Sequence, residues 1–551
     1  MGEADGGEPG KLYYFNDPTG ATELFGRTSP LGRGIDFAFQ GGVKGGASLV
    51  IGVRVDPAGK ATGIIDDGTT ALDVESDDFG VYTNSYSLSI QQGSVTGTMA
   101  VVEGKFVNGQ DYYKKIDNET DFTQLVDKIN DQTALTVTVT AGGSPASASL
   151  DIEYIGSTSA PPYTVPETTF RLYVDGKLVQ YSVPSGGQDL QTVASDIVNV
   201  FNNSALADRF TASTSFSDPI ATITIEANKN KDEENSVPVS LETSTTLSDY
   251  SLPSDTTTSG GTDPVAPTGE SVDLSGGFNS QPILQDWLDV LDSIKYVPLR
   301  YIVPVGTSDI GVQAAVSDHV TLMSSTENRR ERVCVLGHGL GWPEDDGTQD
   351  SIKGRSEFFN SYRVIFCSPG YKTADPGTGL PKTFASHQIT APVVAGMLAA
   401  EGNGVTDPIT HTFLRNVISM EYEYQPNSPR TDKLIRAGTL LVGPEPASVV
   451  PSRGYYVMRA LNTYRVQAGS LSSPSVVNQS DFVAQTVRLM EERLFIGRPI
   501  LPKTLDLLRE KVNKTLTELA EDQYIYGFDA SFTKVQINDD LQEAVDVTYK
   551  I

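Results

Sequence analysis

The stretch from residue 476 to residue 551 changes its hydrophobic period part-way along, and this change constrains the fold more than any other feature of the chain. Apolar residues first recur every three or four positions, which is one face of an α-helix. The prolines Pro499 and Pro502 divide this pattern into two helices. The two stripes are Val483, Val487, Met490 and Leu494, then Leu505, Leu508, Val512, Leu516 and Leu519.

After these helices the period becomes two, which is typical of β-strands. Short strands are expected at 524–526 and 532–537, with a turn at 538–540. The final segment alternates strictly between apolar and polar side chains. Its apolar face consists of Val545, Val547, Tyr549 and Ile551. A strand with one apolar face at the end of a chain needs a partner sheet.

Upstream, strands and helices alternate along the chain. Helices are expected at 282–294, 308–324, 351–360 and 388–400, and strands at 298–303, 331–336 and 362–367. The segment 47–53 is an apolar strand that enters the same core. This alternation predicts an α/β core with a mainly parallel sheet that is covered on both faces.

Between these core segments the composition shifts towards Thr, Ser, Gly and Asp, with strand-like alternation. A weak repeat relates Gly104 to Gly176 and Ile129 to Ile197, each pair marking a strand–helix–strand unit. The repeat predicts two β-rich α+β insertion domains, at 65–160 and 161–250. The alternative is two unrelated β-rich domains. The Thr/Ser/Gly-rich segment 251–275 is expected to be a flexible linker.

Charge and cysteine content exclude several classes of protein. The formal net charge is −29, so phosphate groups would be repelled and free nucleic acid is not expected as a partner. The only cysteines, Cys334 and Cys367, lie in apolar runs and are expected to be buried and reduced. The sequence has neither a secretory signal at its start nor an apolar run long enough to cross a membrane. We therefore expect a soluble protein that is made in the cytoplasm.

An α/β core invites a search for catalytic motifs, and the sequence contains none that is complete. The nearest approach to a phosphate-binding loop, Gly377–Thr383, has Pro381 where its second glycine should stand. A Gly-x-Ser-x-Gly nucleophile motif is absent, and the four histidines lack metal-ligand spacing. The Gly-rich run 337–341 is interpreted as a tight turn after a strand. The sequence predicts no catalytic residue, no cofactor and no metal site.

The order of elements near the C-terminus resembles a known family. Residues 481–483 lead through 494–497 into a second helix, which is followed by the Tyr-Ile-Tyr-Gly-Phe-Asp run at 524–529 and the final alternating strand. This order resembles the C-terminal module of contractile tail sheath proteins, the subunits of phage tails, R-type pyocins and related injection machines. The likeness extends from about Leu284 to Ile551.

The resemblance implies a structural role. Sheath subunits form stacked hexameric rings around an inner tail tube, and terminal strands added to a neighbour's sheet hold the rings together. Contraction releases energy stored at assembly and drives the tube through the host cell envelope, which delivers a genome or an effector without nucleotide hydrolysis. The implied partners are other copies of the chain, the inner tube protein, and baseplate and tail terminator proteins, all within the tail of a virion. Neither nucleic acid nor a membrane is an implied partner.

On this interpretation each part of the chain has a role. Residues 1–34 form an extended N-terminal arm, 35–64 and 276–475 form the α/β sheath core, and 476–551 form the C-terminal module. The C-terminal strand is the first candidate for exchange between subunits. The N-terminal arm is the second, through Leu12, Tyr13, Tyr14 and Phe15.

A basic region marks the candidate contact with the tube. Residues 488–514 contain seven basic and four acidic side chains in a chain that is otherwise strongly acidic. Because the C-terminal module of the family faces the tube, we expect Arg509, Lys511 and Lys514 to contact acidic residues there. An ordinary solvated helix face is the alternative interpretation.

Two other functions are kept as alternatives. One is an α/β hydrolase-like enzyme with appended β domains, and the missing catalytic motifs count against it. The other is an acidic surface protein or adhesin, and the missing signal peptide counts against it.

Overall fold

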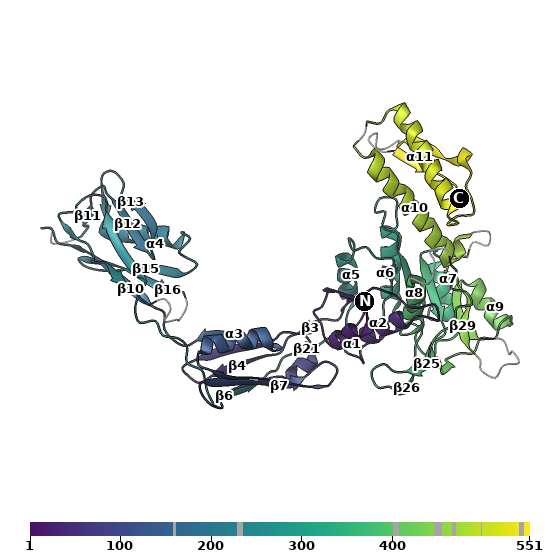
Figure 1. Ribbon diagram of the computed structural model, residues 1–551, viewed down its shortest axis with the longest axis horizontal. Coiled ribbons are helices and arrows are strands. Elements are labelled where there is room, and N and C mark those ends of the chain that lie inside the picture. The colour runs from purple at the N-terminus through teal and green to yellow at the C-terminus, as the bar shows by residue number, and fades with distance from the viewer. Residues whose placement is uncertain are drawn as a thin grey trace.

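The computed structural model describes residues 1–157, 161–228, 235–400, 407–445, 454–465, 470–497, 499–538 and 545–550. Figure 1 shows an α/β core, two β-rich bodies that lead away from it one after the other, and a helical module near the C-terminus that projects on another side. The prediction of a mixed α/β organisation is confirmed. Among the described residues, no helix is long and apolar enough to cross a membrane.

The core is built on a five-stranded sheet with the order β22-β23-β24-β28-β29. Its first three pairings are parallel, and β28 pairs with β29 antiparallel. The strands are β22 (Tyr301–Ile302), β23 (Val333–Gly337), β24 (Val364–Ser368), β28 (Thr439–Pro444) and β29 (Tyr455–Arg459). A small antiparallel sheet beside it contains β25 (Tyr371–Ala374), β26 (Pro381–Phe384) and β27 (Ser419–Met420).

Helices bury both faces of this sheet, because successive side chains of a strand point to opposite sides. Val333 and Val335 pack in the cluster that contains α8, whereas Cys334 and Leu336 pack with α5 and α6. The core helices are α2 (Pro30–Gln40), α5 (Leu284–Ser293), α6 (Ile310–Met323), α7 (Ile352–Phe359), α8 (Thr390–Ala399) and α9 (Pro429–Arg436). Both cysteines are buried and free, as the sequence predicted.

The expected extended arm at 1–34 is instead folded onto the core, so this prediction is wrong. Strand β1 (Leu12–Phe15) pairs antiparallel with β2 (Val50–Val53) of the same chain, and α1 (Pro18–Phe25) and α2 follow it. Asp17 and Ser29 accept hydrogen bonds from the first turns of these helices, each of which begins with proline. Part of the Gly, Pro and Ser content that indicated an arm, namely Pro18, Gly26, Ser29 and Pro30, therefore lies at the ends of helices.

The first β-rich body joins the core through β3 (Ala58–Gly59) and β21 (Phe278–Asn279), which pair with each other. It contains a three-stranded sheet and a four-stranded sheet, packed with one helix around a single apolar cluster. Its elements are β4 (Thr62–Asp66), β5 (Ala71–Ser76), β6 (Ser87–Gln92), β7 (Thr98–Lys105), β8 (Asp111–Glu119), α3 (Phe122–Gln132), β9 (Leu135–Ala141) and β20 (Ser271–Asp273).

The second β-rich body has two four-stranded sheets and the helix α4 around another apolar cluster. Its main elements are β10 (Ser147–Tyr154), β12 (Thr169–Val174), β13 (Lys177–Ser182), α4 (Leu190–Asn202), β15 (Phe210–Ser217), β16 (Ile220–Ala227), β17 (Pro238–Thr243), β18 (Tyr250–Ser251) and β19 (Thr256–Thr257). The helices α3 and α4 occur where the repeat predicted them.

The boundaries of these bodies differ from the expected ones. Strand β10, expected in the first body, pairs with β16 of the second over residues 147–153. The expected linker 251–275 contains β18, β19 and β20, and these pair with β10, β17 and β6. The chain thus returns to the core by adding strands to both bodies, because its Thr and Ser residues suit exposed edge strands as well as linkers.

The C-terminal module contains α10 (Pro474–Phe495), α11 (Pro502–Glu521), β30 (Lys534–Ile537) and β31 (Val545–Thr548). Six residues of the predicted helical stripes, among them Val483 and Leu516, are buried in one cluster with Ile525 and Val535. The expected strand at 524–526 is wrong, because these residues form a bend after α11, where Gln523 has a φ of 63°.

Candidate assembly interface

Buried hydrogen bonds and ion pairs hold the C-terminal module in contact with the core. Arg363, just before β24, donates to both carboxylate oxygens of Asp481 on α10, at 2.6 and 2.8 Å. Two turns further along α10, the Arg488 guanidinium lies 2.5 Å from a Glu331 carboxylate oxygen. The hydroxyl of Tyr301 donates to the side-chain oxygen of Asn478 at 3.0 Å. The start of α10 is thereby held in one orientation on the sheet.

These anchoring residues were missed by sequence reasoning. Arg363 and Asp481 are 118 positions apart, and the run 481–483 gives no indication that Asp481 pairs with Arg363. An acidic residue on the apolar side of α10 was the only available signal, since a charge in such a position needs a buried partner.

The terminal hairpin contains the residues expected to be exchanged between subunits. Strand β31 pairs antiparallel with β30 of the same chain, with Val545 opposite Ile537 and Thr548 opposite Lys534. The side chains of Val545, Val547 and Tyr549 pack against the cluster between α10 and α11, and Ile551 lies outside the described residues. Within the described chain this sheet has two strands, so the second edge of β31 is unpaired. Donation of this strand to another subunit stays a prediction.

The other expected strand, Leu12, Tyr13, Tyr14 and Phe15, lies against β2. Tyr13 and Phe15 contact the ring of Phe25 edge-on, at centroid distances of 5.6 and 5.7 Å. Tyr14 points outward and is 61% exposed. This strand also has a partner within its own chain, and its exchange between subunits stays a prediction.

The three basic residues expected to face the tube lie on α11. Arg509 and Lys514 are exposed, whereas Lys511 is half-buried. Arg509 lies 3.7 Å from Asp506, and Lys514 lies 3.6 Å from Glu518. These exposed pairs contribute little to stability, roughly 0–1 kcal/mol each. The cations therefore remain available to a partner surface, and their contact with a tube stays a prediction.

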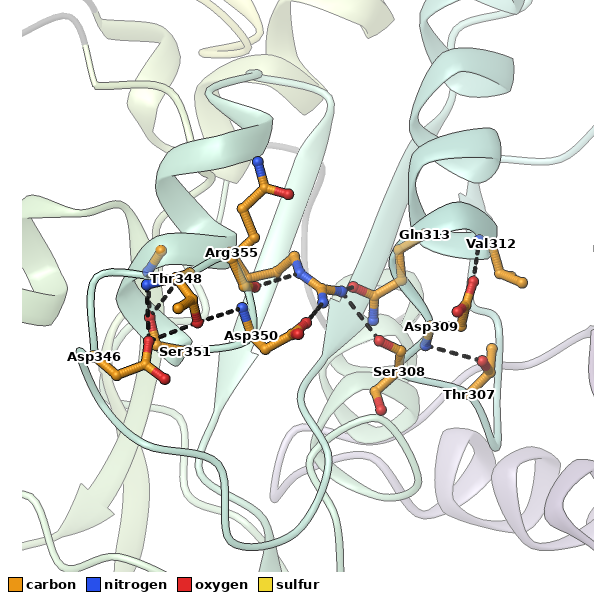
Figure 2. A network of polar contacts seen from close by, with 12 residues as sticks. Thr307, Ser308, Asp309, Val312, Gln313, Asp346, Thr348, Asp350, Ser351 and Arg355 are labelled. Atoms are coloured by element: carbon orange, nitrogen blue, oxygen red, sulfur yellow. Dashed lines mark hydrogen bonds and ion pairs between the residues drawn. The ribbon is translucent and has the colours of Figure 1, made fainter.

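A polar network (Figure 2) joins the segments that follow β22 and β23, at the carboxyl ends of parallel strands, where an α/β enzyme would hold its site. The guanidinium of the fully buried Arg355 donates to the carbonyls of Gln349 and Ser308, to Gln313 Oε1 and to Asp350 Oδ1, at 2.6–3.1 Å. These hydrogen bonds of Arg355, which lies on α7, connect α7 to the long loop after β23 and to the start of α6.

A serine and a histidine meet beside this network, a pairing that the sequence did not reveal. His338 Nδ1 lies 2.7 Å from the carbonyl of Gly339, and its Nε2 lies 3.1 Å from the hydroxyl of Ser368. Both side chains are fully buried, and burial lowers the pKa of His338 to about 4. Burial likewise lowers the pKa of His387 to about 4. Because a substrate cannot reach Ser368, the pair forms part of the packed core rather than a nucleophilic site.

The described residues contain no group of three or more His, Cys, Asp or Glu side chains that could hold a metal ion. In the Gly-rich run 337–341 only Gly341 has a left-handed backbone, with a φ of 72°, as a tight turn requires.

Comparison with known proteins finds similarity both in sequence and in structure. No family model matches the chain. The tail sheath protein of Bacillus phage SP01 is 27% identical over 269 residues, which are 47% of this chain and 43% of that protein. The chain therefore matches less than half the length of this relative.

Two of the similar solved structures are the sheath tail proteins of Desulfitobacterium hafniense and Listeria innocua. Each has a TM-score of 0.52 and is matched over 87% of its length. The matches cover 96% and 98% of this chain at 14% and 12% identity, so they show a shared fold over nearly all of it.

Proposed function

We propose that this chain, which is related in sequence and fold to tail sheath proteins, is the structural subunit of a contractile tail sheath. The observation that carries the proposal is the likeness to two sheath structures over nearly the whole chain, together with a sequence match to a phage sheath protein. We infer a non-enzymatic role, which agrees with the polar network that joins the segments after β22 and β23.

In the proposed assembly, copies of the chain form hexameric rings that stack around an inner tube. The C-terminal strand links neighbouring subunits. Among the residues that the structure describes, only one edge of this strand is paired, which supports this role. A strand ladder suits this purpose, because its many hydrogen bonds can follow a neighbour as it rotates.

Contraction requires subunits that move as rigid bodies. The Arg363–Asp481 and Arg488–Glu331 pairs support such rigidity, because they hold α10 on the core sheet. We propose that energy stored at assembly drives the movement and that no nucleotide takes part. Within a virion tail, the sheath would contact baseplate proteins at one end and terminator proteins at the other. Its contraction would drive the tube through the host envelope to deliver a genome or an effector.

The two β-rich bodies are proposed to lie on the outside of the sheath. They lead away from the core and do not lie beside the C-terminal module (Figure 1). If the C-terminal module faces the tube, the two β-rich bodies point away from the tube.

Ultracentrifugation of the purified chain tests the proposal. In buffer with EDTA and without nucleotide, the chain should still form particles that sediment far faster than a 59.1 kDa monomer. A chain that stays monomeric at all concentrations and salt conditions, or that polymerises only with a nucleotide or metal, would contradict the proposed function.

A further inference from the structure

A carboxyl oxygen without a hydrogen-bond partner lies next to the terminal hairpin, which is formed by β30 and β31. Glu491, near the end of α10, lines a cavity that this helix shares with α11 and β31. Its Oε1 atom is buried and makes no hydrogen bond within the described part of the chain. The apolar side chains around the cavity include Phe495, Leu505, Leu508, Val545 and Val547. In such surroundings a carboxylate is unfavourable unless a cation or hydrogen-bond donors compensate its charge.

The two cations that act on this carboxyl are bound to other groups. Arg488, one turn before Glu491, donates to the two oxygens of the Glu331 carboxylate at 2.5 and 3.4 Å and to the carbonyl of Arg329 at 2.9 Å. The Nε of Arg329 donates to the carbonyl of Thr326 at 3.0 Å. Among the described residues, Glu491 forms no ion pair with either guanidinium. No direct ion pair therefore compensates its burial.

The neighbouring elements add no further cation. Helix α11 lines the cavity with Thr504, Leu505 and Leu508, none of which carries a charge. On α10 itself, the negative charge of Glu492 disfavours ionisation of Glu491.

The strand β31 brings one titratable group towards Glu491, and this is the hydroxyl of Tyr549 just after the strand. Burial, and then the charge of Glu491, raises the pKa of Tyr549 to about 12, so Tyr549 is uncharged near neutral pH. The charged side chains of this segment, Asp546 and Lys550, make their contacts with other residues.

Few contacts hold the terminal hairpin on the module. Strand β31 has four residues, and within the described chain only its edge towards β30 is paired. Val545, Val547 and Tyr549 are only partly buried against the cluster between α10 and α11. Elements with few buried contacts open at a lower free energy than the core. A charge that develops under β31 can therefore release the hairpin without unfolding the helices.

We propose that Glu491 is a pH switch for the terminal hairpin. While its carboxyl is protonated, the hairpin packs on α10 and α11. When the carboxyl loses its proton, the equilibrium shifts towards a detached hairpin, because water can then solvate the carboxylate. The switch is a property of the single chain, so it goes beyond the proposed function and does not depend on polymerisation.

The pH range of the switch follows from the two environments of the carboxyl. Burial raises the pKa of Glu491 from 4.5 to about 7 while the hairpin is packed, although the charges of Arg329 and Arg488 act to lower it. In the detached state water solvates the carboxyl, and its pKa returns towards 4.5. The packed hairpin therefore binds more protons than the detached one between these values. Its packing weakens as the pH rises from 4.5 to 7, by at most about tenfold per pH unit, and changes little above 7.

Hydrogen exchange of the full chain at pH 5 and pH 7.5 tests the switch. The chain is kept at a concentration at which ultracentrifugation shows a monomer, and each amide rate is divided by the rate of an unstructured peptide at the same pH. A two-stranded hairpin is not stable alone in water, so its amides lose protection once it detaches. The protection of the β30 and β31 amides should be about 30- to 100-fold lower at pH 7.5 than at pH 5. The amides of Val483 and Val487, in the part of α10 held on the core, should keep their protection and serve as the internal control.

Glu491→Gln isolates the carboxyl. Glutamine has nearly the same shape and cannot ionise, so the hairpin of this variant should be equally protected at both pH values. The matched control is Glu510→Gln, which removes an exposed carboxylate of α11 and should leave the pH dependence of the wild type unchanged.

Equal protection of the wild-type hairpin at the two pH values would overturn the proposal, as would stronger protection at pH 7.5. A folded Glu491→Gln variant that keeps the pH dependence of the wild type would do the same. Loss of protection at Val483 and Val487 together with the hairpin would show that the module opens as one unit, without a switch. Absence of polymers with the pH dependence intact would contradict the proposed function alone.

Discussion

At the scale of single residues, the position of the C-terminal module depends on the buried pair of Arg363 and Asp481. Arg363→Ala leaves Asp481 buried without a cation, which costs on the order of 3–5 kcal/mol. The half-exposed pair of Arg465 and Glu357, at 3.2 Å, is the control, and Arg465→Ala should cost at most about 1 kcal/mol. The two losses of stability are measured by urea unfolding, which is monitored through the signal of a fluorophore attached to α10. Equal losses in the two variants would contradict the anchoring role of Arg363.

Three buried histidines predict a dependence on pH. Burial lowers the pKa values of His319, His338 and His387 from 6.5 to about 4, so the unfolded chain binds more protons between these values. The free energy of unfolding should therefore fall as the pH drops from 6.5 towards 4, by up to about 3 kcal/mol per histidine. Glu491, whose pKa burial raises to about 7, acts in the opposite direction.

The histidine contribution is isolated by substitution. The stability of His338→Gln should depend less on pH than that of the wild type when urea unfolding is measured at pH 7 and pH 4.5. An unchanged pH dependence would show that His338 does not titrate on unfolding.

Sequence reasoning reached some of these residues and not others. The burial of Cys334 and Cys367 followed from their apolar neighbours, which are local in the sequence. The contact of His338 with Ser368 did not, because it joins the ends of two strands whose adjacency only the fold creates.

At the scale of elements, the terminal strand is predicted to be needed for polymerisation. Removal of 544–551 should leave a folded monomer that cannot polymerise, because α10 and α11 retain their cluster with Ile525 and Val535. Sedimentation measures polymerisation, and circular dichroism measures folding. Unfolding of the truncated chain would mean that β31 serves only its own module. Normal polymers would mean that this strand does not link subunits.

The basic face of α11 makes a separate prediction. Reversing the charges of Arg509, Lys511 and Lys514 to Glu should give sheaths that assemble without a tube, because attraction to an acidic tube becomes repulsion. The matched control reverses three exposed charges in the β-rich bodies, namely Lys105, Arg171 and Lys177. Co-sedimentation of sheath and tube proteins measures the effect. Tube binding that survives the α11 variant unchanged would refute this contact.

Elements with a sustained period were predictable, and short ones were not. The stripes of α10 and α11 extend over several turns, so the pattern indicates one structure. The three apolar residues at 524–526 suit a strand equally well, and the end of α11 places them in a bend instead. The helices α1 and α2 were missed because their Pro, Gly and Ser residues are common in both loops and helix caps.

At the scale of the whole molecule, the β-rich bodies are predicted to be dispensable for the core. The strands β3 and β21 pair with Gly59 opposite Phe278, so a short Gly-Ser bridge can replace residues 60–277. The shortened chain should fold and polymerise. A second variant replaces only residues 146–259, which form the second β-rich body, with the same Gly-Ser bridge. Insolubility of both chains would show that the bodies support the core.

The sequence predicted the presence of these bodies but not their limits. Composition distinguished them from the core because their Thr-rich strands differ from the apolar core strands. It could not assign β10 or the segment 251–275, because pairing across the molecule decides which body an edge strand joins.

Electron microscopy of the purified full-length chain in negative stain tests the central claim most directly. We expect hollow tubes or stacked rings with six subunits per ring, formed without nucleotide. A field of single elongated particles at every concentration and salt condition would contradict the sheath assignment.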